Sequence, residues 1–409
     1  MQIFLKKSNI NTDSNLIITG SKSESNRCLL LKALFNDITI ENLSNSDDTE
    51  LMKNALSSNH SLIDIHHAGT AMRFLTAFFA TQNGRKIILT GSSRMKERPI
   101  RILVDALRNL GAKIEYSENE GFPPLKIQGQ ELLKSEVFLK ANVSSQYISA
   151  LLLIAPSLKN GLNLYLDGKI TSIPYIEMTL ALLNEVGIKT SFESNKIKVF
   201  PYEGHNSKTL IVESDWSSAS YFYSIVSLSS VGTKINISSY NENSLQGDAI
   251  LSEIYNSLGV SSKFNDSVLT IEKVSDDLPK SLDLDLSNTP DIAQTIAVSC
   301  LGLQINCNLT GLHTLKIKET DRLLALKNEI KKLGTNIEIS NNSLEINLPK
   351  PLLKNVEIKT YNDHRMAMSF APLILRTDIY INDANVVSKS YPNFWNDLEK
   401  LGLNLAFQK

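Results

Sequence analysis

The chain has 409 residues, 42% of them hydrophobic and 21% charged, and a formal net charge of −1. These values are typical of a globular protein with two or more domains, and they exclude a strong overall attraction to nucleic acid or to a membrane surface. An anion-binding site would have to be formed by a local cluster of basic residues.

The cysteines and the N-terminus indicate a cytoplasmic protein. Cys28, Cys300 and Cys307 stand in apolar contexts and form no CxxC pair, which argues against a disulfide framework and favours a reducing compartment. The N-terminal stretch has no apolar run followed by a small-residue cleavage site, and no segment is apolar for the length of a membrane span. The six histidines include no HxxxH on a helical pattern, so no structural zinc site is expected.

The first predicted helix begins in the stretch GSKSESNRCLLLKALF, residues 20–35. One interpretation is an ordinary helix start, in which Ser23 or Ser25 accepts hydrogen bonds from free backbone N–H groups. The other is an anion site, because a helix N-terminus offers unpaired N–H donors and Lys22 and Arg27 add positive charge. The stretch alone leaves both interpretations open.

Polar or charged residues also precede the later apolar helices. In chain order these stretches are AGTAMR at 68–73, TGSSRMKERPIR at 90–101, NVSSQ at 142–146, PD at 290–291, KETDR at 318–322 and NDHR at 362–365. Each one alone is also typical of a helix cap or a solvated loop. Together they place several basic groups beside two carboxylates, Asp291 and Glu319. That combination favours a small polyanionic substrate with acid–base chemistry at its centre.

A unit of an amphipathic helix, a glycine and a short strand recurs along the chain. The copies are LVDALRNLGAKIEY, TLALLNEVGIKTSF, LSEIYNSLGVSSKF, LKNEIKKLGTNIEI and FWNDLEKLGLNLAF, with glycines at 111, 187, 259, 334 and 402. Each glycine suits the left-handed position that ends a helix, and the spacing indicates a repeated unit of roughly 70 residues. The class is therefore α/β or α+β, with six units in two domains of three. The sixth copy, near LMKNALSSNHSLIDI, lacks the glycine and is cut short.

Seven stretches follow the order in which they occur in the 5-enolpyruvylshikimate-3-phosphate synthase family. They read GSKSESNR, AGTAMR, TGSSRMKERPI, SSQ, SDWSSASYF, KETDR and YNDHRMAM. The chain resembles that family from about Gly20 to SKSYPNFWNDLEKLG near the C-terminus. The resemblance implies the two-domain enolpyruvyl transferase fold, with three βαβαββ units in each domain around a central cleft. Residues 20–213 would form one domain, and residues 1–19 with 214–409 the other, because the chain crosses the hinge twice.

The same resemblance implies a transferase of the shikimate pathway, which serves chorismate and aromatic amino acid biosynthesis. The enolpyruvyl group of phosphoenolpyruvate would move to the 5-hydroxyl of shikimate 3-phosphate, with release of phosphate. No metal or organic cofactor is implied. The expected partners are these two small molecules, with no nucleic acid and no membrane, and the protein is expected to be a monomer.

Site residues follow from the resemblance wherever this sequence matches a family motif. Shikimate 3-phosphate would be bound by Lys22, Ser23, Arg27, Ser144, Ser145, Gln146, Ser172, Tyr175, Asp291, Thr314 and Lys318. Phosphoenolpyruvate would be bound by Lys22, Gly69, Arg94, Gln146, Glu319, Arg322, Arg365 and Lys389. Asp291 would take the proton from the attacking hydroxyl. Glu319 would give and recover the proton at the methylene carbon, with Lys22 assisting.

Some positions depart from the family pattern. The usual asparagine before AGTAMR is His67, and the proline after it is Phe74. The proline before GSKS is Thr19, and an asparagine that helps to hold the shikimate phosphate is Thr314. The contact predicted for Thr314 would therefore come from a hydroxyl group in place of the usual amide.

The largest departure is a deletion in the first repeat unit. Only about 20 residues separate Asp48 from Gly69, roughly half of the spacing that the family commonly has. We predict that the first unit lacks a pair of strands but keeps its catalytic loop.

Two other functions compete with this interpretation. A UDP-N-acetylglucosamine enolpyruvyl transferase would share the fold and the donor, but it commonly has a cysteine in the loop that here reads SSRMKERP. A non-catalytic sugar-phosphate-binding protein would be expected to lack Asp291 or Glu319, and both are present. The shortened first unit keeps this second alternative open.

Overall fold

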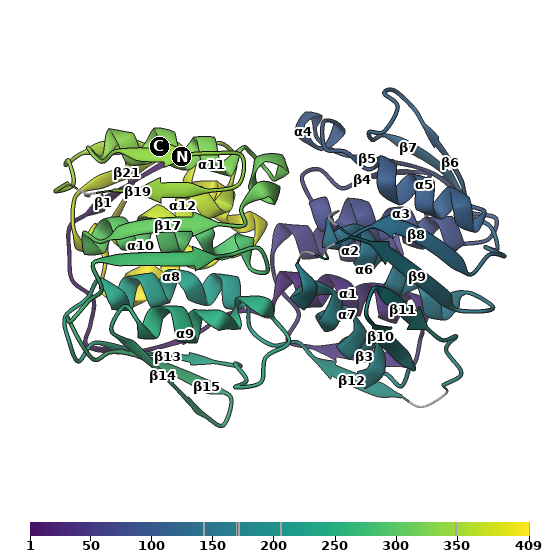
Figure 1. Cartoon of the computed structure of the whole chain (residues 1–409), viewed down its shortest axis with the longest axis horizontal. Coiled ribbons are helices and arrows are strands. Elements are labelled where there is room, and N and C mark those ends of the chain that lie inside the picture. Colours follow the sequence, from purple (N-terminus) through teal and green to yellow (C-terminus); the bar gives the residue numbers. More distant parts are fainter. Residues whose placement is uncertain (142–143, 169, 171, 205–206, 348–349, 409) are drawn as a thin grey trace. The chain divides into compact units, whose positions relative to one another are not determined.

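The computed structural model describes residues 1–141, 144–168, 170, 172–204, 207–347 and 350–408. The chain forms two compact units, each with its own hydrophobic core. Unit 1 consists of Met1–Thr19 and Glu213–Lys409, and unit 2 consists of Gly20–Val212. Figure 1 labels the helices and strands of both units. The predicted mixed class of helices and strands is confirmed.

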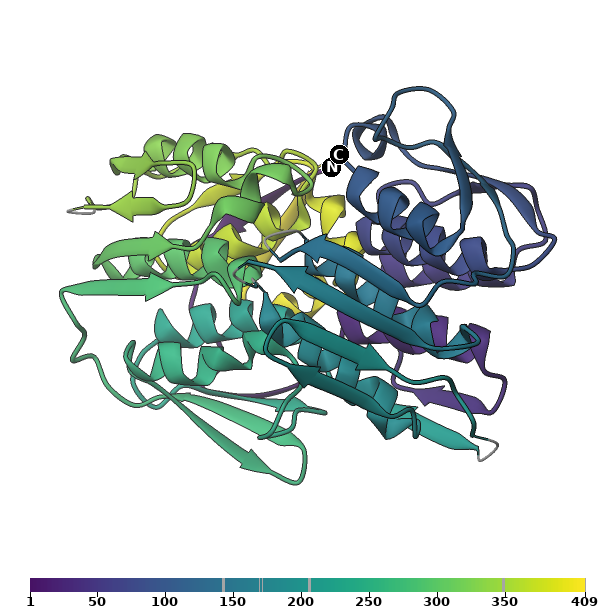
Figure 2. The same ribbon diagram turned by 45° about the vertical axis from the view of Figure 1, so that its right-hand side comes forward.

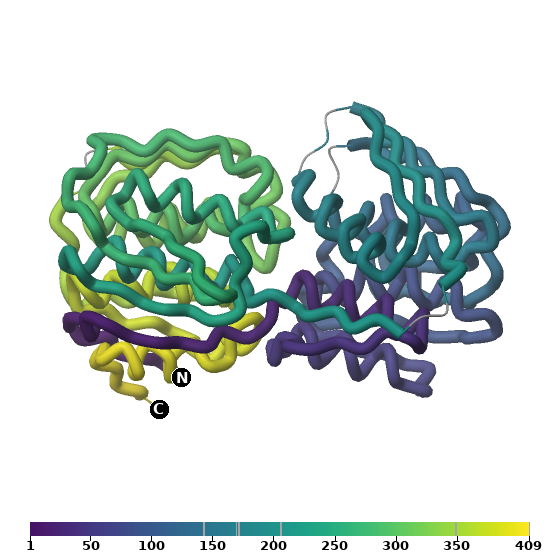
Figure 3. The backbone as a smooth tube through the Cα atoms, turned by 90° about the horizontal axis from the view of Figure 1, so that it is seen from below, coloured from purple at the N-terminus to yellow at the C-terminus, as the bar shows by residue number. Residues whose placement is uncertain are grey.

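The chain passes between the units at two points, after Thr19 and after Val212. Within unit 1 the two connecting segments are joined by hydrogen bonds. The Ser214 hydroxyl donates to the carbonyl of Ile18 at 2.6 Å, and the Asp215 N–H donates to the carbonyl of Thr19 at 3.3 Å. Figure 3 shows these two segments side by side.

Unit 1 contains three four-stranded sheets with the same plan. In each sheet two neighbouring strands are parallel, and two further strands extend the sheet in antiparallel pairing. In spatial order the sheets are β2 (Asp13–Ile17), β13 (Lys234–Ser238), β15 (Val268–Lys273) and β14 (Val260–Asn265); β16 (Ser281–Asp285), β17 (Asn306–Thr310), β19 (Leu344–Ile346) and β18 (Ile337–Ile339); and β20 (Val356–Ile358), β21 (Ile379–Ile381), β1 (Gln2–Lys6) and β22 (Asn404–Gln408).

Three helices of unit 1 form its centre: α8 (Trp216–Ser227), α10 (Ala293–Leu303) and α12 (His364–Phe370). They are buried along almost their whole length and pack against one another. Such burial is expected for helices with few charged residues on any face. The remaining helices and 3₁₀ helices are α9 (Leu251–Asn256), α11 (Arg322–Lys332), α13 (Phe394–Lys400), η2 (Gly247–Ile250), η3 (Pro290–Ile292), η4 (His313–Ile317), η5 (Ala371–Leu375) and η6 (Ala384–Lys389).

Unit 2 has two sheets of the same plan. They are β4 (Leu62–Asp64), β5 (Lys86–Thr90), β7 (Leu125–Gln128) and β6 (Lys113–Tyr116), and β8 (Glu136–Lys140), β9 (Leu162–Asp167), β11 (Lys196–Val199) and β10 (Thr190–Glu193). In Figure 2 the teal strands of the second sheet lie in front of the helices of this unit. These helices are α1 (Lys22–Leu34), α2 (Asp47–Ser57), α3 (Gly69–Thr81), α4 (Ser93–Lys96), α5 (Arg101–Leu110), α6 (Ser145–Ile154), η1 (Ala155–Ser157) and α7 (Ile173–Glu185).

The third sheet of unit 2 confirms the predicted deletion. Among the described residues it consists of two strands, β3 (Ile38–Glu41) and β12 (Lys208–Ile211), which pair in parallel. The antiparallel pair of the other sheets is absent from it. After α2 ends at Ser57, the chain enters β4 at Leu62, which already belongs to the next sheet.

The repeat glycines adopt the predicted conformation. Gly111, Gly187, Gly259, Gly334 and Gly402 have φ angles of 114°, 88°, 75°, 94° and 90°. A residue with a Cβ atom rarely adopts such angles, which is why the repeat requires glycine where each of these helices turns into a strand.

Candidate active site

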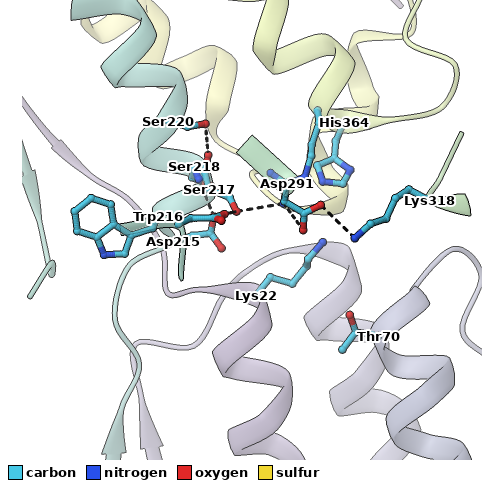
Figure 4. A network of polar contacts seen from close by, with 12 residues as sticks. Lys22, Thr70, Asp215, Trp216, Ser217, Ser218, Ser220, Asp291, Lys318 and His364 are labelled. Atoms are coloured by element: carbon cyan, nitrogen blue, oxygen red, sulfur yellow. Dashed lines mark hydrogen bonds and ion pairs between the residues drawn. The ribbon is translucent and has the colours of Figure 1, made fainter. Parts of the chain in front are cut away.

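The carboxylate of Asp291 is the centre of a polar network in unit 1, part of which is shown in Figure 4. Asp291 lies in η3, which leads directly into the buried helix α10. Lys318 Nζ lies 3.3 Å from its Oδ1, Arg322 Nη1 lies 2.9 Å from Oδ1, and Arg365 Nη2 lies 3.4 Å from Oδ2. Burial opposes the charged form, but these three cations outweigh it and hold the pKa of Asp291 well below its usual range. The carboxyl is therefore ionised at neutral pH.

Arg322 joins three carboxylates that come from separate segments. It is the first residue of α11, whose N-terminus is capped by Asp321. Its side chain is 1% exposed. Nε lies 2.7 Å from Asp363 and Nη2 lies 2.8 Å from Glu319, in addition to the contact with Asp291. Burial alone would lower the pKa of Arg322, but the three carboxylates outweigh it and raise that pKa. The guanidinium group stays charged and holds Glu319 close to Asp291.

Arg365 is placed by the first turn of α12. The Asp363 side chain caps this helix by accepting a hydrogen bond from the Arg365 N–H at 2.9 Å. The Arg365 guanidinium group donates to the Ser217 hydroxyl at 3.2 Å. Lys389, at the end of η6, donates from Nζ to the carbonyl of Asn362 at 2.6 Å. The loop before α12 therefore has two predicted ligands of phosphoenolpyruvate beside it.

These residues form a site for an anion with a base and an acid at hand. Asp291 and Glu319 are partly accessible, and their neighbours Lys318, Arg322 and Arg365 are cationic. A bound phosphate or carboxylate would share these cations with Asp291. Charge-assisted hydrogen bonds to such groups are the strong ones in proteins. The arrangement can bind an anionic substrate and transfer protons next to it.

Thr314 lies in η4, the 3₁₀ helix that ends directly before Lys318 of the charged cluster. Its Oγ1 atom is buried, and it has no hydrogen-bond partner among the residues that the structure describes. Buried hydroxyls are normally paired. An oxygen atom of a ligand would satisfy this one.

In unit 2, Lys22 is linked to Asp48 and His67. Lys22 is the first residue of α1, and its Nζ lies 3.6 Å from Asp48 Oδ2. His67 Nε2 lies 3.4 Å from the other carboxylate oxygen, Oδ1. Asp48 is 5% exposed. His67, one of the departures from the family pattern, therefore shares a carboxylate with the lysine that is predicted to act in catalysis.

The first helix, α1, begins at Lys22, and its N-cap is not the residue that we expected. The N-cap is Ser21, whose side chain accepts from the backbone N–H of Glu24, and not Ser23 or Ser25. Ser25 instead accepts a hydrogen bond from the N–H of Ser44 at 2.9 Å. The pattern did not identify the cap because three serines stand within five residues of one another.

Arg27 is buried inside unit 2 and connects α1 with α6 and α7. Its Nε donates to Thr179 Oγ1 at 2.8 Å, Nη1 to the carbonyl of Ser23 at 2.7 Å, and Nη2 to Ser149 Oγ at 3.0 Å and to the carbonyl of Tyr175 at 3.3 Å. Burial lowers the pKa of Arg27 to about 10. Arg27 thereby fixes two backbone positions, at Ser23 and Tyr175, whose side chains are predicted ligands of shikimate 3-phosphate.

Replacing Thr179 by valine is expected to destabilise the protein by about 1–3 kcal/mol, because it leaves a buried donor of Arg27 unpaired. The free energy of unfolding in urea measures this effect. Thr76→Val is the matched control, since the Thr76 hydroxyl donates to the carbonyl of Met72 in its own helix. Equal losses in the two variants would show that Thr179 does not support Arg27.

The N-terminus of α3 is tightly packed around Gly69. A Cβ atom at this position would lie 2.4 Å from Arg98 Nη1, so a larger residue would require the end of the Arg98 side chain to move. The next residue, Thr70, accepts a hydrogen bond from Gln146 Nε2 at 3.2 Å. The structure therefore brings the predicted ligands Gly69 and Gln146 together through Thr70.

The other predicted ligands of unit 2 lie at helix starts. Ser144 caps α6 by accepting from the N–H of Gln146, and Ser145 is the first residue of that helix. Ser172 occupies the N-cap position of α7 in a left-handed conformation with a φ angle of 56°, without a capping hydrogen bond from its side chain. Arg94 lies in α4 and forms an ion pair with Glu97 at 2.9 Å on the protein surface.

Comparison with known proteins identifies the family. The family model described as EPSP synthase (3-phosphoshikimate 1-carboxyvinyltransferase) matches residues 55–398. A 3-phosphoshikimate 1-carboxyvinyltransferase from Bacteroides fragilis (strain YCH46) is 47% identical over 393 residues, which are 95% of each chain. The chain belongs to the EPSP synthase family. An EPSP synthase family member from Actinobacillus pleuropneumoniae (serotype 5b, strain L20), also a 3-phosphoshikimate 1-carboxyvinyltransferase by name, is 35% identical over 95% of this chain and 96% of its own.

Solved structures confirm the fold of the EPSP synthase family. EPSP synthase from Acinetobacter baumannii superposes with a TM-score of 0.80 at 20% identity and with 100% coverage of both chains. The enolpyruvyl transferase NikO from Streptomyces tendae gives a TM-score of 0.75 at 13% identity, covering 99% of this chain and 98% of its own. The predicted enolpyruvyl transferase fold is therefore correct.

The described residues of this EPSP synthase family member contain neither a membrane-spanning helix nor a metal-binding cluster of side chains. None of its helices combines the length and the apolar character that crossing a membrane requires. No group of three or more His, Cys, Asp and Glu side chains among them is arranged to hold a metal ion.

The sequence did not single out some residues that the structure places in these networks. Asp48 contacts Lys22, and Ser217 contacts Arg365. Thr70 joins Gly69 to Gln146, and Asp248 in η2 bonds to Ser217. Asp48 and Asp248 are almost completely buried carboxylates, which need partners. The need of a buried carboxylate for a partner was the only property that could have identified these residues. The sequence alone does not show which carboxylates are buried.

Proposed function

We propose that this chain transfers the enolpyruvyl group of phosphoenolpyruvate to the 5-hydroxyl of shikimate 3-phosphate and releases phosphate. The reaction belongs to the shikimate pathway of aromatic amino acid biosynthesis. The observation that carries the proposal is the cluster of Asp291 and Glu319 with Lys318, Arg322 and Arg365, in a chain of the EPSP synthase family.

In this proposal shikimate 3-phosphate is bound by one group of residues at helix starts and by a second group around Asp291. The first group consists of Lys22, Ser23, Arg27, Ser144, Ser145, Gln146, Ser172 and Tyr175, and the second of Asp291, Thr314 and Lys318. Helix N-termini offer free N–H donors to phosphate. The unpaired hydroxyl of Thr314 supports its inclusion, because a phosphate oxygen is a suitable partner for it.

Phosphoenolpyruvate is bound by Lys22, Gly69, Arg94, Gln146, Glu319, Arg322, Arg365 and Lys389. The planar guanidinium groups of Arg322 and Arg365 suit carboxylate and phosphate groups, which they bind with paired hydrogen bonds. Both are almost completely buried and held in place by carboxylates. They are therefore positioned before the substrate arrives.

The proton transfers are divided between two carboxylates. Asp291 takes the proton of the attacking 5-hydroxyl while the new C–O bond forms at the second carbon of phosphoenolpyruvate. Glu319 gives a proton to the methylene carbon, which yields a tetrahedral adduct, and Lys22 assists. The bond to the phosphate oxygen then breaks, phosphate leaves with the electron pair, and Glu319 recovers a proton from the methyl group.

Substrate binding makes Asp291 a better base. In the substrate-free protein, Lys318, Arg365 and Arg322 hold the pKa of Asp291 low against the effect of burial. A bound phosphoenolpyruvate anion shares these cations, so the carboxylate loses part of their stabilisation and its pKa rises. A general base acts best when its pKa approaches the working pH.

The acceptor can be tested directly by phosphate release. Phosphoenolpyruvate is incubated with the protein and shikimate 3-phosphate and, in a parallel reaction, with UDP-N-acetylglucosamine. We expect release with shikimate 3-phosphate alone. Release with UDP-N-acetylglucosamine would reassign the acceptor, and no release with either from the folded protein would favour the non-catalytic binding protein.

The remaining expectations on location and assembly belong to the same proposal. The protein acts as a cytoplasmic monomer on these two small molecules. Its three cysteines are free and buried, which fits a reducing compartment.

A further inference from the structure

A directed chain of hydrogen bonds extends from Arg365 away from the Asp291 cluster. Arg365 Nη2 donates one N–H to the Ser217 hydroxyl oxygen at 3.2 Å. The Ser217 hydroxyl in turn donates to Oδ2 of Asp248. The same Nη2 atom lies 3.4 Å from Asp291. Ser217, bonded to Asp248, and the proposed base Asp291 thus contact the same nitrogen atom of the guanidinium group.

Asp248 is a buried carboxylate inside a set of charged neighbours. It is 4% exposed, and its Oδ1 atom has no hydrogen-bond partner among the residues that the structure describes. The charged groups that face it are Asp291, Arg365 and Asp215, and Ser217 is its hydrogen-bonding neighbour. Burial, reinforced by Asp291, raises the pKa of Asp248 to about 6. At neutral pH it is ionised, so the Ser217 proton points toward it and a lone pair of the hydroxyl faces Arg365.

The start of α8 and the neighbouring loop are held in place without the hydrogen bonds between Arg365, Ser217 and Asp248. The N-terminus of α8 is capped by Asp215, which accepts from the Ser218 N–H at 2.7 Å. The loop before η2 is held against α8 by Gln246, which accepts from the Trp216 N–H at 3.0 Å and donates to the carbonyl of Ser214 at 2.9 Å. Capping and loop attachment are therefore complete without Ser217 and Asp248.

We propose that Ser217 and Asp248 are positioning residues that fix the guanidinium group of Arg365 for binding phosphoenolpyruvate. The contact between Arg365 and Asp291 is long. Without a second hydrogen-bond partner, the guanidinium group of Arg365 would move together with the Asp291 carboxylate. The Ser217 hydroxyl, oriented by Asp248, holds Nη2 in one place while Asp291 changes its protonation state. This inference rests on the proposed function, because it assigns Arg365 to phosphoenolpyruvate.

The test compares KM and kcat for phosphoenolpyruvate at saturating shikimate 3-phosphate in four variants. In Ser217→Ala and Asp248→Ala we expect KM to rise about tenfold, with a smaller change in kcat. A tenfold change is the usual effect of losing one charge-assisted hydrogen bond. The double variant should be no worse than either single variant, because both cut the same chain. Asp248→Asn keeps an acceptor for Ser217 and should recover part of the affinity.

Ser227→Ala serves as the matched control. Ser227 is a buried serine of the same helix, and its hydroxyl donates to the carbonyl of Ser224 within that helix. The KM of the Ser227→Ala variant for phosphoenolpyruvate should equal that of the unchanged protein. A tenfold rise in KM in Ser227→Ala, or an unchanged KM in both Ser217→Ala and Asp248→Ala, would overturn the inference. If the unchanged protein releases no phosphate at all, the proposed function fails instead, so the two failures are distinguishable.

Discussion

Asp291→Asn is expected to lower kcat by about 10²–10⁴-fold, the usual contribution of a positioned general base. The amide keeps the size of the carboxylate but cannot take the proton of the attacking hydroxyl. Lys318, Arg322 and Arg365 also lose the carboxylate that all three contact. The KM for the anionic substrates should therefore change little or fall, while phosphate release slows. A steady-state assay of phosphate release separates the two parameters.

The stability of the Asp291→Asn variant provides an independent check. Because the folded state lowers the pKa of this carboxyl, its ionised form stabilises the fold above the unfolded pKa of about 3.9. That contribution disappears as the pH falls through the lower folded value. The free energies of unfolding of the two proteins should therefore differ near neutral pH and converge toward acid pH. Asp283→Asn, an exposed carboxylate on β16, is the control and should match the parent protein in rate and stability. A kcat within threefold of the parent protein for Asp291→Asn would contradict the assigned role.

Arg322→Met should cost about 3–5 kcal/mol of stability, because it removes the cation that compensates buried carboxylates. Asp363 is completely buried, and Arg322 is its ion-pair partner at 2.7 Å. Glu319 loses the same partner. Binding of phosphoenolpyruvate should be lost together with the stability. Urea unfolding measures the first effect, and isothermal titration with phosphoenolpyruvate measures the second.

Two comparisons make the Arg322 result specific. Arg322→Lys keeps the charge but not the planar fork that reaches three carboxylates, so it should retain part of the stability and little of the binding. Arg101→Met removes an exposed ion pair with Glu120 and should change stability by no more than about 1 kcal/mol. A stability loss for Arg322→Met as small as that for Arg101→Met would refute the role given to the buried network.

The sequence predicted the repeated architecture because its signals are local. A glycine that ends a helix and the alternation of the following strand are properties of a few consecutive residues. Gly111 and its four counterparts adopt the expected positive φ angles. The shortened first unit was also predictable, since a deletion between Asp48 and Gly69 is visible as a missing length of chain.

Pairings between distant segments were not predictable in this way. The strand β1 at the N-terminus completes a sheet near the C-terminus, with Phe4 opposite Tyr380 and Ala406. Likewise β3 pairs with β12, whose register places Ile38 beside Lys208. Such pairings depend on the packing of whole units, and periodicity along a single strand does not contain them.

In the candidate site, too, the sequence predicted local features but not contacts between distant segments. The residues that stand in family motifs, such as Arg322 and Arg365, could be named from the sequence. Their partners could not, because Asp363, Asp248 and Ser217 reach them from other elements of the fold. The cap of α1 was misassigned to Ser23 or Ser25 for a related reason, since neighbouring serines differ only in the geometry that the folded chain gives them.

In the proposed reaction, shikimate 3-phosphate adds to phosphoenolpyruvate and forms an adduct that is protonated at the methylene carbon. The most direct measurement is proton NMR of the reaction in D₂O. A solvent deuteron enters the methyl group of the adduct, and loss of either of the two original hydrogens then leaves deuterium in the product. We predict an enolpyruvyl product of shikimate 3-phosphate whose methylene group carries deuterium. Pyruvate as the only product, or an enolpyruvyl product free of deuterium, would contradict the account.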